Sequence, residues 1–305
     1  RYSVALQVAQ SKTATGLTTE KHATVQDAIN AAGVGGTVTL LADSSNPGAT
    51  SNSMTIDGNG KKMGTLYVNA PANVTIKNLK ADTVNVAASA TADFSGADTE
   101  IGKLDNSGTV SISAGKYKTI GGTGTYSITG GLFGIKVDDK WCAKVPVSGK
   151  TEGTASSLTK YTAVANTDPA TKDEYPYTVT VAPNPRITKI SNSAYFQRNS
   201  NGTLTIYTDR TVDELVKNTN TYQQDQYPYR CLTVTSANGT TNIITPRYYT
   251  VTADDNGNAV ITISNEFLKY RTVGTYSVQV EYTTGVTQPE TFRVGTSPKT
   301  GDESN

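Results

Sequence analysis

The residues of this chain that could move protons are mainly carboxylates. The 305 residues include one histidine, His22, and two cysteines, which leaves little material for imidazole catalysis or a multi-histidine metal site. Two converging carboxylates could act as acid and base in sugar hydrolysis. Asp82 and Glu100 are 18 positions apart, a spacing that could stack them on one face of a repeating fold. Such a pair more often consists of solvated surface or turn residues, and we expect no catalytic residue, cofactor or metal site.

A tyrosine-rich segment suggests sugar binding instead. Thirteen of the 17 tyrosines lie from Tyr161 onward, and Tyr222, Tyr227 and Tyr229 fall in one short stretch that ends at Arg230. Glutamines and an aspartate lie between them. Flat rings surrounded by amide, carboxylate and guanidinium groups suit sugars, so we predict Tyr222, Tyr227, Tyr229 and Arg230 as ligand-binding residues. The alternative, that loop tyrosines merely cover a sheet edge, stays open.

Composition narrows the class of protein. The chain has 27 Lys and Arg against 26 Asp and Glu, a net charge of +1, so we expect no nucleic-acid partner. Threonine occupies 50 positions. Because β-branched side chains favour pleated strands over helices, this composition predicts an all-β protein.

The strands predicted in the N-terminal half are short and repeat. One set of apolar residues recurs at intervals of 20, 18, 18 and 16, and a second set at 18, 20, 16 and 15. An irregular repeat of this size is typical of a parallel β-solenoid, in which stacked coils place like residues in interior columns. An ordinary antiparallel meander is the alternative. The first set is Ile56, Ile76, Phe94, Ile112 and Ile128, and the second is Leu66, Val84, Leu104, Ile120 and Ile135.

A short helix is predicted over residues 24–32, just before the first coil. Thr24 can cap it, Asp27 suits its first turn, and Gly33 can end it. An open solenoid end needs protection against edge pairing, so we expect this helix to be a cap. The predicted organisation is a parallel β-helix with a capping helix over 1–145, a linker over 146–174, a β-sandwich over 175–295 and a polar tail over 296–305.

The sandwich is predicted from longer strands that alternate cleanly and are separated by Asn-Gly turns. Several such strands within about 100–130 residues indicate an immunoglobulin-like fold. Short helical turns are expected at 212–217 and 266–270. Cys142 and Cys231 could form one bridge between the two domains, or be two unrelated small apolar residues.

The N-terminal half resembles a known group. Lys-His-Ala-Thr-Val-Gln-Asp-Ala-Ile-Asn-Ala-Ala at 21–32 and Thr-Val-Thr-Leu-Leu at 37–41 resemble the opening of β-helix domains in Gram-positive, often clostridial, surface proteins. Segments 128–133 and 141–143 are similar to their closing coil. The resemblance implies a right-handed, pectin-lyase-like β-helix in which His22 is an interface residue. Pectate-lyase-type activity would need an arginine base, and no arginine lies between Arg1 and Arg186.

The C-terminal half resembles another module. Segments 249–251, 260–263, 266–268, 273–276 and 278–280 look like the X2-type immunoglobulin-like module of bacterial carbohydrate-active and surface proteins.

The tail contains a motif similar to a sortase-type wall anchor, whose general form is Leu-Pro-x-Thr-Gly. Pro298, Lys299, Thr300 and Gly301 match it, and Ser297 replaces the leucine. The resemblance implies sortase or a membrane anchor as a partner. Together these resemblances imply a non-enzymatic, extracellular protein on a Gram-positive cell surface that acts in adhesion or carbohydrate binding, with a glycan or a host or cell-surface protein as partner. A polysaccharide-active β-helix enzyme and a passive structural stalk are the alternatives.

Overall fold

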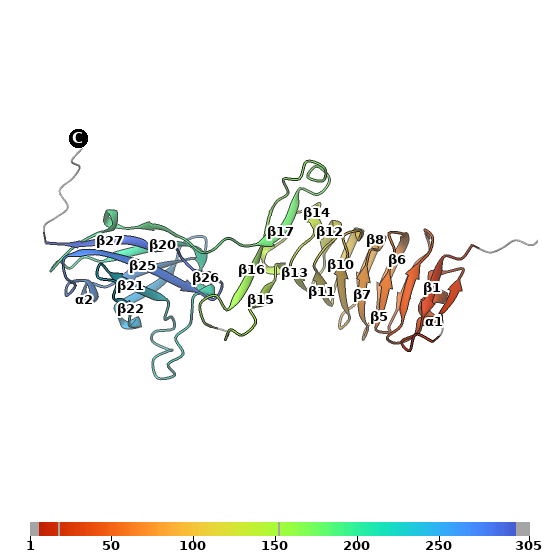
Figure 1. The fold of residues 1–305 in the computed structure, drawn as a ribbon, viewed down its shortest axis with the longest axis horizontal. Coiled ribbons are helices and arrows are strands. Elements are labelled where there is room, and N and C mark those ends of the chain that lie inside the picture. The colour runs from red at the N-terminus through yellow and green to blue at the C-terminus, as the bar shows by residue number, and fades with distance from the viewer. Residues whose placement is uncertain (1–5, 18, 152, 297–305) are drawn as a thin grey trace, which may run out of the picture. The chain divides into compact units, whose positions relative to one another are not determined.

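The computed structural model describes residues 6–17, 19–151 and 153–296, and it divides into two compact units (Figure 1). Unit 1 comprises the residues up to Lys144 together with Lys160–Ala182. Unit 2 comprises Val145–Thr159 and the residues from Pro183 onward. The chain therefore passes between the units three times.

Unit 1 is a parallel β-solenoid of about five turns. Each turn contributes one strand to each of two sheets, and successive strands in each sheet run parallel. The predicted solenoid is confirmed, and the antiparallel meander is wrong. The first sheet contains β3 (Thr37–Leu40), β5 (Met54–Asp57), β7 (Asn73–Lys77), β9 (Thr91–Ser95), β11 (Thr109–Ile112) and β13 (Thr125–Ile128); the second contains β4 (Gly48–Thr50), β6 (Lys62–Val68), β8 (Lys80–Val86), β10 (Glu100–Asn106), β12 (Lys116–Gly121) and β14 (Leu132–Phe133).

The first predicted column is confirmed residue by residue. Strand register places Ile56 opposite Ile76, Ile76 opposite Phe94, and so on to Ile112 and Ile128. All five side chains are at most 1% exposed. Alternation along each strand turns every second side chain inward, so residues in register form an apolar column.

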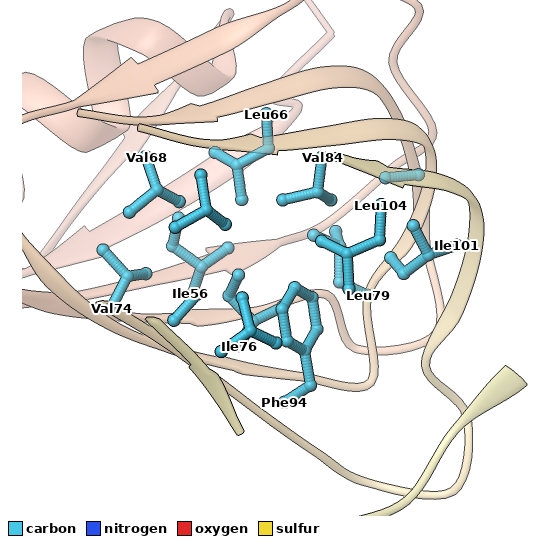
Figure 2. Close-up of a cluster of buried hydrophobic side chains, with 14 of the residues drawn as sticks. Ile56, Leu66, Val68, Val74, Ile76, Leu79, Val84, Phe94, Ile101 and Leu104 are labelled. Atoms are coloured by element: carbon cyan, nitrogen blue, oxygen red, sulfur yellow. The ribbon is translucent and has the colours of Figure 1, made fainter. Parts of the chain in front are cut away.

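The second predicted column is confirmed up to its last member. Leu66, Val84, Leu104 and Ile120 lie in register. Figure 2 shows the first three pointing into the interior from one side, with Ile56, Ile76 and Phe94 of the first column on the other. The register ends earlier than predicted, because β14 stops at Phe133 and Ile135, half-buried, lies beyond it.

A third interior column was not predicted from the sequence. Its members change from aliphatic to aromatic along the solenoid, and the Tyr117 ring stacks on Phe133 at 5.5 Å. Because the residue types differ from coil to coil, the sequence pattern did not reveal this column. The strand register nevertheless places its members directly opposite one another. The column consists of Met63, Ala81, Ile101, Tyr117 and Phe133.

The coils are also held together by a buried amide. Asn106 is fully buried and donates from Nδ2 to the Thr125 carbonyl of the next coil at 2.9 Å. Its Oδ1 accepts from the Gly108 backbone N–H at 2.8 Å. Because a buried polar group must find partners, this amide fixes the turn between coils.

The N-terminal part of unit 1 contains α1 (Val25–Ala32), where a helix was predicted. The Asp27 backbone N–H donates to Thr24 Oγ1 at 3.0 Å, as an N-cap requires. Val25, Ala28, Ile29 and Ala32 are buried in the same core cluster as the interior columns. Two antiparallel strands, β1 (Ala9–Lys12) and β2 (Thr19–His22), extend the first sheet beyond β3.

At the other end, the second sheet continues beyond β14 in antiparallel fashion. β14 pairs with β17 (Tyr177–Val181), and β17 pairs with β16 (Leu158–Ala165). The predicted linker 146–174 therefore contains a long strand, which the sequence hid because β16 has no clear alternation of buried and exposed residues. This region also contains η1 (Asp139–Trp141) and β15 (Lys144–Pro146).

Unit 2 consists of two sheets around one buried cluster. The longest strand, β25 (Gly274–Tyr282), alternates as a sandwich strand should, because Tyr276, Val278, Val280 and Tyr282 are all buried. One sheet has the order β18 (Ile187–Ile190), β20 (Leu204–Thr211), β24 (Asn258–Ile263), β23 (Tyr249–Ala253); the other has the order β19 (Tyr195–Gln197), β27 (Glu290–Gly295), β25 (Gly274–Tyr282), β21 (Leu232–Ser236), β22 (Thr241–Ile243), with β26 (Gly285–Val286) beside β25. The short helices are η2 (Asn192–Ala194), η3 (Val212–Glu214), η4 (Pro246–Tyr248) and α2 (Asn265–Leu268).

Candidate functional site

The candidate acid pair of the solenoid is not stacked. Glu100 lies opposite Lys80 across the β8–β10 ladder, so this coil is 20 residues long and the 18-residue spacing to Asp82 misses the register. Asp82 instead forms an ion pair with Lys62 at 2.7 Å, and Glu100 lies 3.9 Å from the Lys80 ammonium. The two carboxylate side chains are 61% and 39% exposed, as solvated surface residues are.

The tyrosine-rich segment is a loop of unit 2 closed at its base. Lys217 and Tyr229 form an antiparallel bridge, and the Lys217 ammonium lies 4.3 Å from the centre of the Tyr229 ring. Asn218, which is buried, donates from Nδ2 to the Tyr227 carbonyl at 2.9 Å. The Tyr249 hydroxyl donates to the Tyr229 carbonyl at 3.0 Å. These bonds fix the backbone of both loop tyrosines before any ligand arrives.

Tyr227 and Tyr229 line one pocket of about 250 Å³. Both side chains are half-buried, so part of each ring is available to a ligand. Arg247 adds a guanidinium and Thr250 adds a hydroxyl. Rings with a few polar groups around them are the usual composition of a small carbohydrate site. The remaining lining residues are Gln226, Pro228, Pro246, Tyr249 and Val251.

The other two predicted residues lie elsewhere. Arg230 lines an adjacent pocket of about 190 Å³, which shares Pro246 with the first. Tyr222 is 98% exposed and lines neither pocket. The structure therefore brings Tyr227 and Tyr229 together, places Arg230 next to them, and separates Tyr222 from the group.

Two larger pockets were missed by the sequence analysis. They measure about 430 and 310 Å³ and share four residues, Asn242, Phe267, Tyr270 and Arg271. These come from β22 and from α2 and the residues after it, which are far apart in the sequence. The available signal was the run of basic and aromatic residues within the predicted helical turn at 266–270 and directly after it.

Both cysteines are free and buried. Burial raises the pKa of Cys142 to about 11 and that of Cys231 to about 12. Both groups are therefore protonated thiols at neutral pH, which are poor nucleophiles and poor metal ligands.

The other features singled out in the sequence are His22 and the anchor-like motif. His22 lies in β2, where its Nε2 is 2.8 Å from Ser11 Oγ. Within residues 6–17, 19–151 and 153–296, no group of three or more His, Cys, Asp or Glu side chains could hold a metal ion. None of the helices in these ranges is long and apolar enough to cross a membrane. The anchor-like residues Pro298, Lys299, Thr300 and Gly301 and most of the predicted tail lie outside these ranges.

The sequence matches no protein-family model, and a search of curated proteins finds no match.

Proposed function

We propose that this protein binds carbohydrate through the pocket that contains Tyr227 and Tyr229, as a non-enzymatic protein displayed outside the cell. The observation that supports this proposal most is the preorganisation of the Tyr227 and Tyr229 rings. Their backbone is held by Asn218 and Tyr249, and their side chains stay half-buried beside Arg247. A sugar that stacks on such rings meets little cost of ordering them.

The architecture is proposed to serve display. The buried face of α1 and its position before the first coil support a capping role. The parallel pairing of successive coils in both sheets supports a β-helix of the pectin-lyase-like kind. The two sheets of unit 2 around one cluster support an X2-type immunoglobulin-like module. The motif at Pro298, Lys299, Thr300 and Gly301 supports anchoring of the protein to a Gram-positive envelope by sortase.

The test compares ring-removing and ring-preserving variants on a glycan array. Tyr227→Ala and Tyr229→Ala remove the stacking surface and are expected to abolish binding, whereas Tyr227→Phe keeps the ring and is expected to retain most of it. Tyr222→Ala is the matched control, since this loop tyrosine is 98% exposed and outside the pocket. Far-UV circular dichroism checks that each variant is folded. Unchanged binding by both alanine variants would refute the proposed site.

Two rival functions have distinct outcomes. If the protein binds no glycan and no host or cell-surface protein, the passive stalk is favoured. If it releases reducing sugar from a polysaccharide and loses this activity with Asp82→Ala or Glu100→Ala, the non-enzymatic proposal is wrong. The ion pairs of these two acids, and the fact that they are not in register, argue against this activity.

A further inference from the structure

Four pockets of unit 2 adjoin one another along the segment from β22 to β23, because each shares lining residues with the next. The pockets of about 310 and 430 Å³ share Asn242 and Arg271. The 430 Å³ pocket shares Thr245 with the pocket of about 190 Å³, which shares Pro246 with the tyrosine pocket of about 250 Å³. We call this connected surface the basic groove. Its extent suits a chain of several sugar units better than a single sugar.

The charge of the basic groove departs strongly from that of the chain. The lining residues of the four pockets include four cationic side chains and one carboxylate, Glu266, a formal excess of three positive charges. The whole chain carries only +1. The positive charge is therefore local to this surface. The four cations are Arg230, Arg247, Lys269 and Arg271.

Three of these cations are held against aromatic rings. The Arg271 guanidinium lies 4.4 Å from the Phe267 ring centre, and its Nε donates to the Phe267 carbonyl at 3.2 Å. The Arg247 guanidinium lies 4.6 Å from the Tyr248 ring and donates to the Tyr248 hydroxyl at 2.6 Å.

Lys269 lies 5.0 Å from the Tyr270 ring centre. Cation–π contacts of this kind position each charge without neutralising it. A guanidinium has five N–H donors, so one bond to the protein leaves further donors for a ligand.

We infer that the basic groove binds an acidic polysaccharide, one that carries carboxylate or sulfate groups on its sugars. Guanidinium groups pair with carboxylate and sulfate oxygens through two parallel hydrogen bonds. The tyrosine rings and the Asn242 amide supply stacking and hydrogen bonds for the sugars between the charges. This inference rests on the proposed carbohydrate binding and names its ligand class. A nucleic acid is the competing polyanion, and an oligonucleotide is therefore one arm of the test.

The test measures binding of the full 305-residue chain to polygalacturonate and dextran sulfate, with uncharged dextran as the neutral counterpart, by isothermal titration calorimetry. One or both polyanions are expected to bind, more weakly at high salt, and dextran to bind at least about tenfold more weakly. Arg271→Gln and Arg247→Gln are each expected to weaken polyanion binding about tenfold, because each loses a charge-assisted hydrogen-bonding group.

Lys189→Gln is the matched control. Its ammonium lies 5.5 Å from the Tyr207 ring, so it is the same kind of basic–aromatic pair in unit 2, but it lines none of the four pockets. An equal loss of binding with Lys189→Gln would show general charge attraction and overturn the inference. Equal binding of dextran would overturn it while leaving the proposed carbohydrate binding intact.

Equal binding of a single-stranded oligonucleotide would overturn the inference in favour of a nucleic-acid groove, since rings and cations also suit unpaired bases. Absence of binding to all three polysaccharides and on the glycan array would remove both the inference and the proposed function.

Discussion

Replacing Ile76 by alanine tests the interior column on which unit 1 depends. Ile76 is fully buried and lies in register between Ile56 and Phe94. The change removes three carbon atoms, worth about 2.4 kcal/mol at about 0.8 kcal/mol per buried CH₂ group. Backbone ladders hold the coils about 4.8 Å apart, so the neighbours cannot close the gap completely. A remaining cavity of about 50 Å³ adds about 1 kcal/mol.

We therefore expect Ile76→Ala to lower the free energy of unfolding by about 3–4 kcal/mol. The assay is urea unfolding followed by tryptophan fluorescence. The single tryptophan, Trp141, lies in unit 1, with its ring 4.8 Å from that of Tyr126, so its emission reports on the solenoid.

Thr75→Ala is the matched control for this measurement. Thr75 precedes Ile76 in the same strand, is half-buried on the outer face, and is expected to cost less than about 1 kcal/mol. If the two variants lose equal stability, the side chain of Ile76 does not fill a packed column and the reasoning is wrong.

Two further predictions concern a turn and a thiol. Gly122 has φ of 102°, and a Cβ there would overlap the Asn106 carbonyl oxygen, whereas a Cβ at Gly121 meets nothing within 4 Å. In urea unfolding, Gly122→Ala is expected to lower the free energy of unfolding by more than about 2 kcal/mol, and Gly121→Ala by less than about 1 kcal/mol. Equal losses would contradict the turn geometry. Burial raises the pKa of Cys231 to about 12, so above about pH 9 the unfolded thiol ionises while the folded one stays protonated, and stability falls as pH rises. Between about pH 8 and about pH 10, the free energy of unfolding of the unsubstituted protein, measured in urea, is expected to fall by about 1 kcal/mol more than that of Cys231→Ala. Equal decreases would mean that the folded thiol ionises normally.

Much of the solenoid could be predicted from the sequence because its order is local and periodic. The intervals between Ile56, Ile76, Phe94, Ile112 and Ile128 are the coil lengths themselves, so counting along the chain gave the register. The same counting failed for the acid pair, because coil length varies and the coil that joins β8 to β10 has 20 residues. A prediction that assumes one coil length is therefore safe only where an apolar column supports it.

The candidate site shows where such prediction ends. The sequence alone determined that aromatic, amide and basic residues are concentrated in the tyrosine-rich segment, since composition is a property of the chain. It grouped Tyr222 with Tyr227 because they are neighbours in the chain, although the structure separates them.

Tertiary structure alone decided that Tyr227 and Arg247 line the same pocket, and that Asn242 and Arg271 line both larger pockets. The physical reason is that antiparallel strands and the turns between them bring distant segments to one edge of a sheet, and this pairing depends on the packing of the whole unit rather than on any local run of residues.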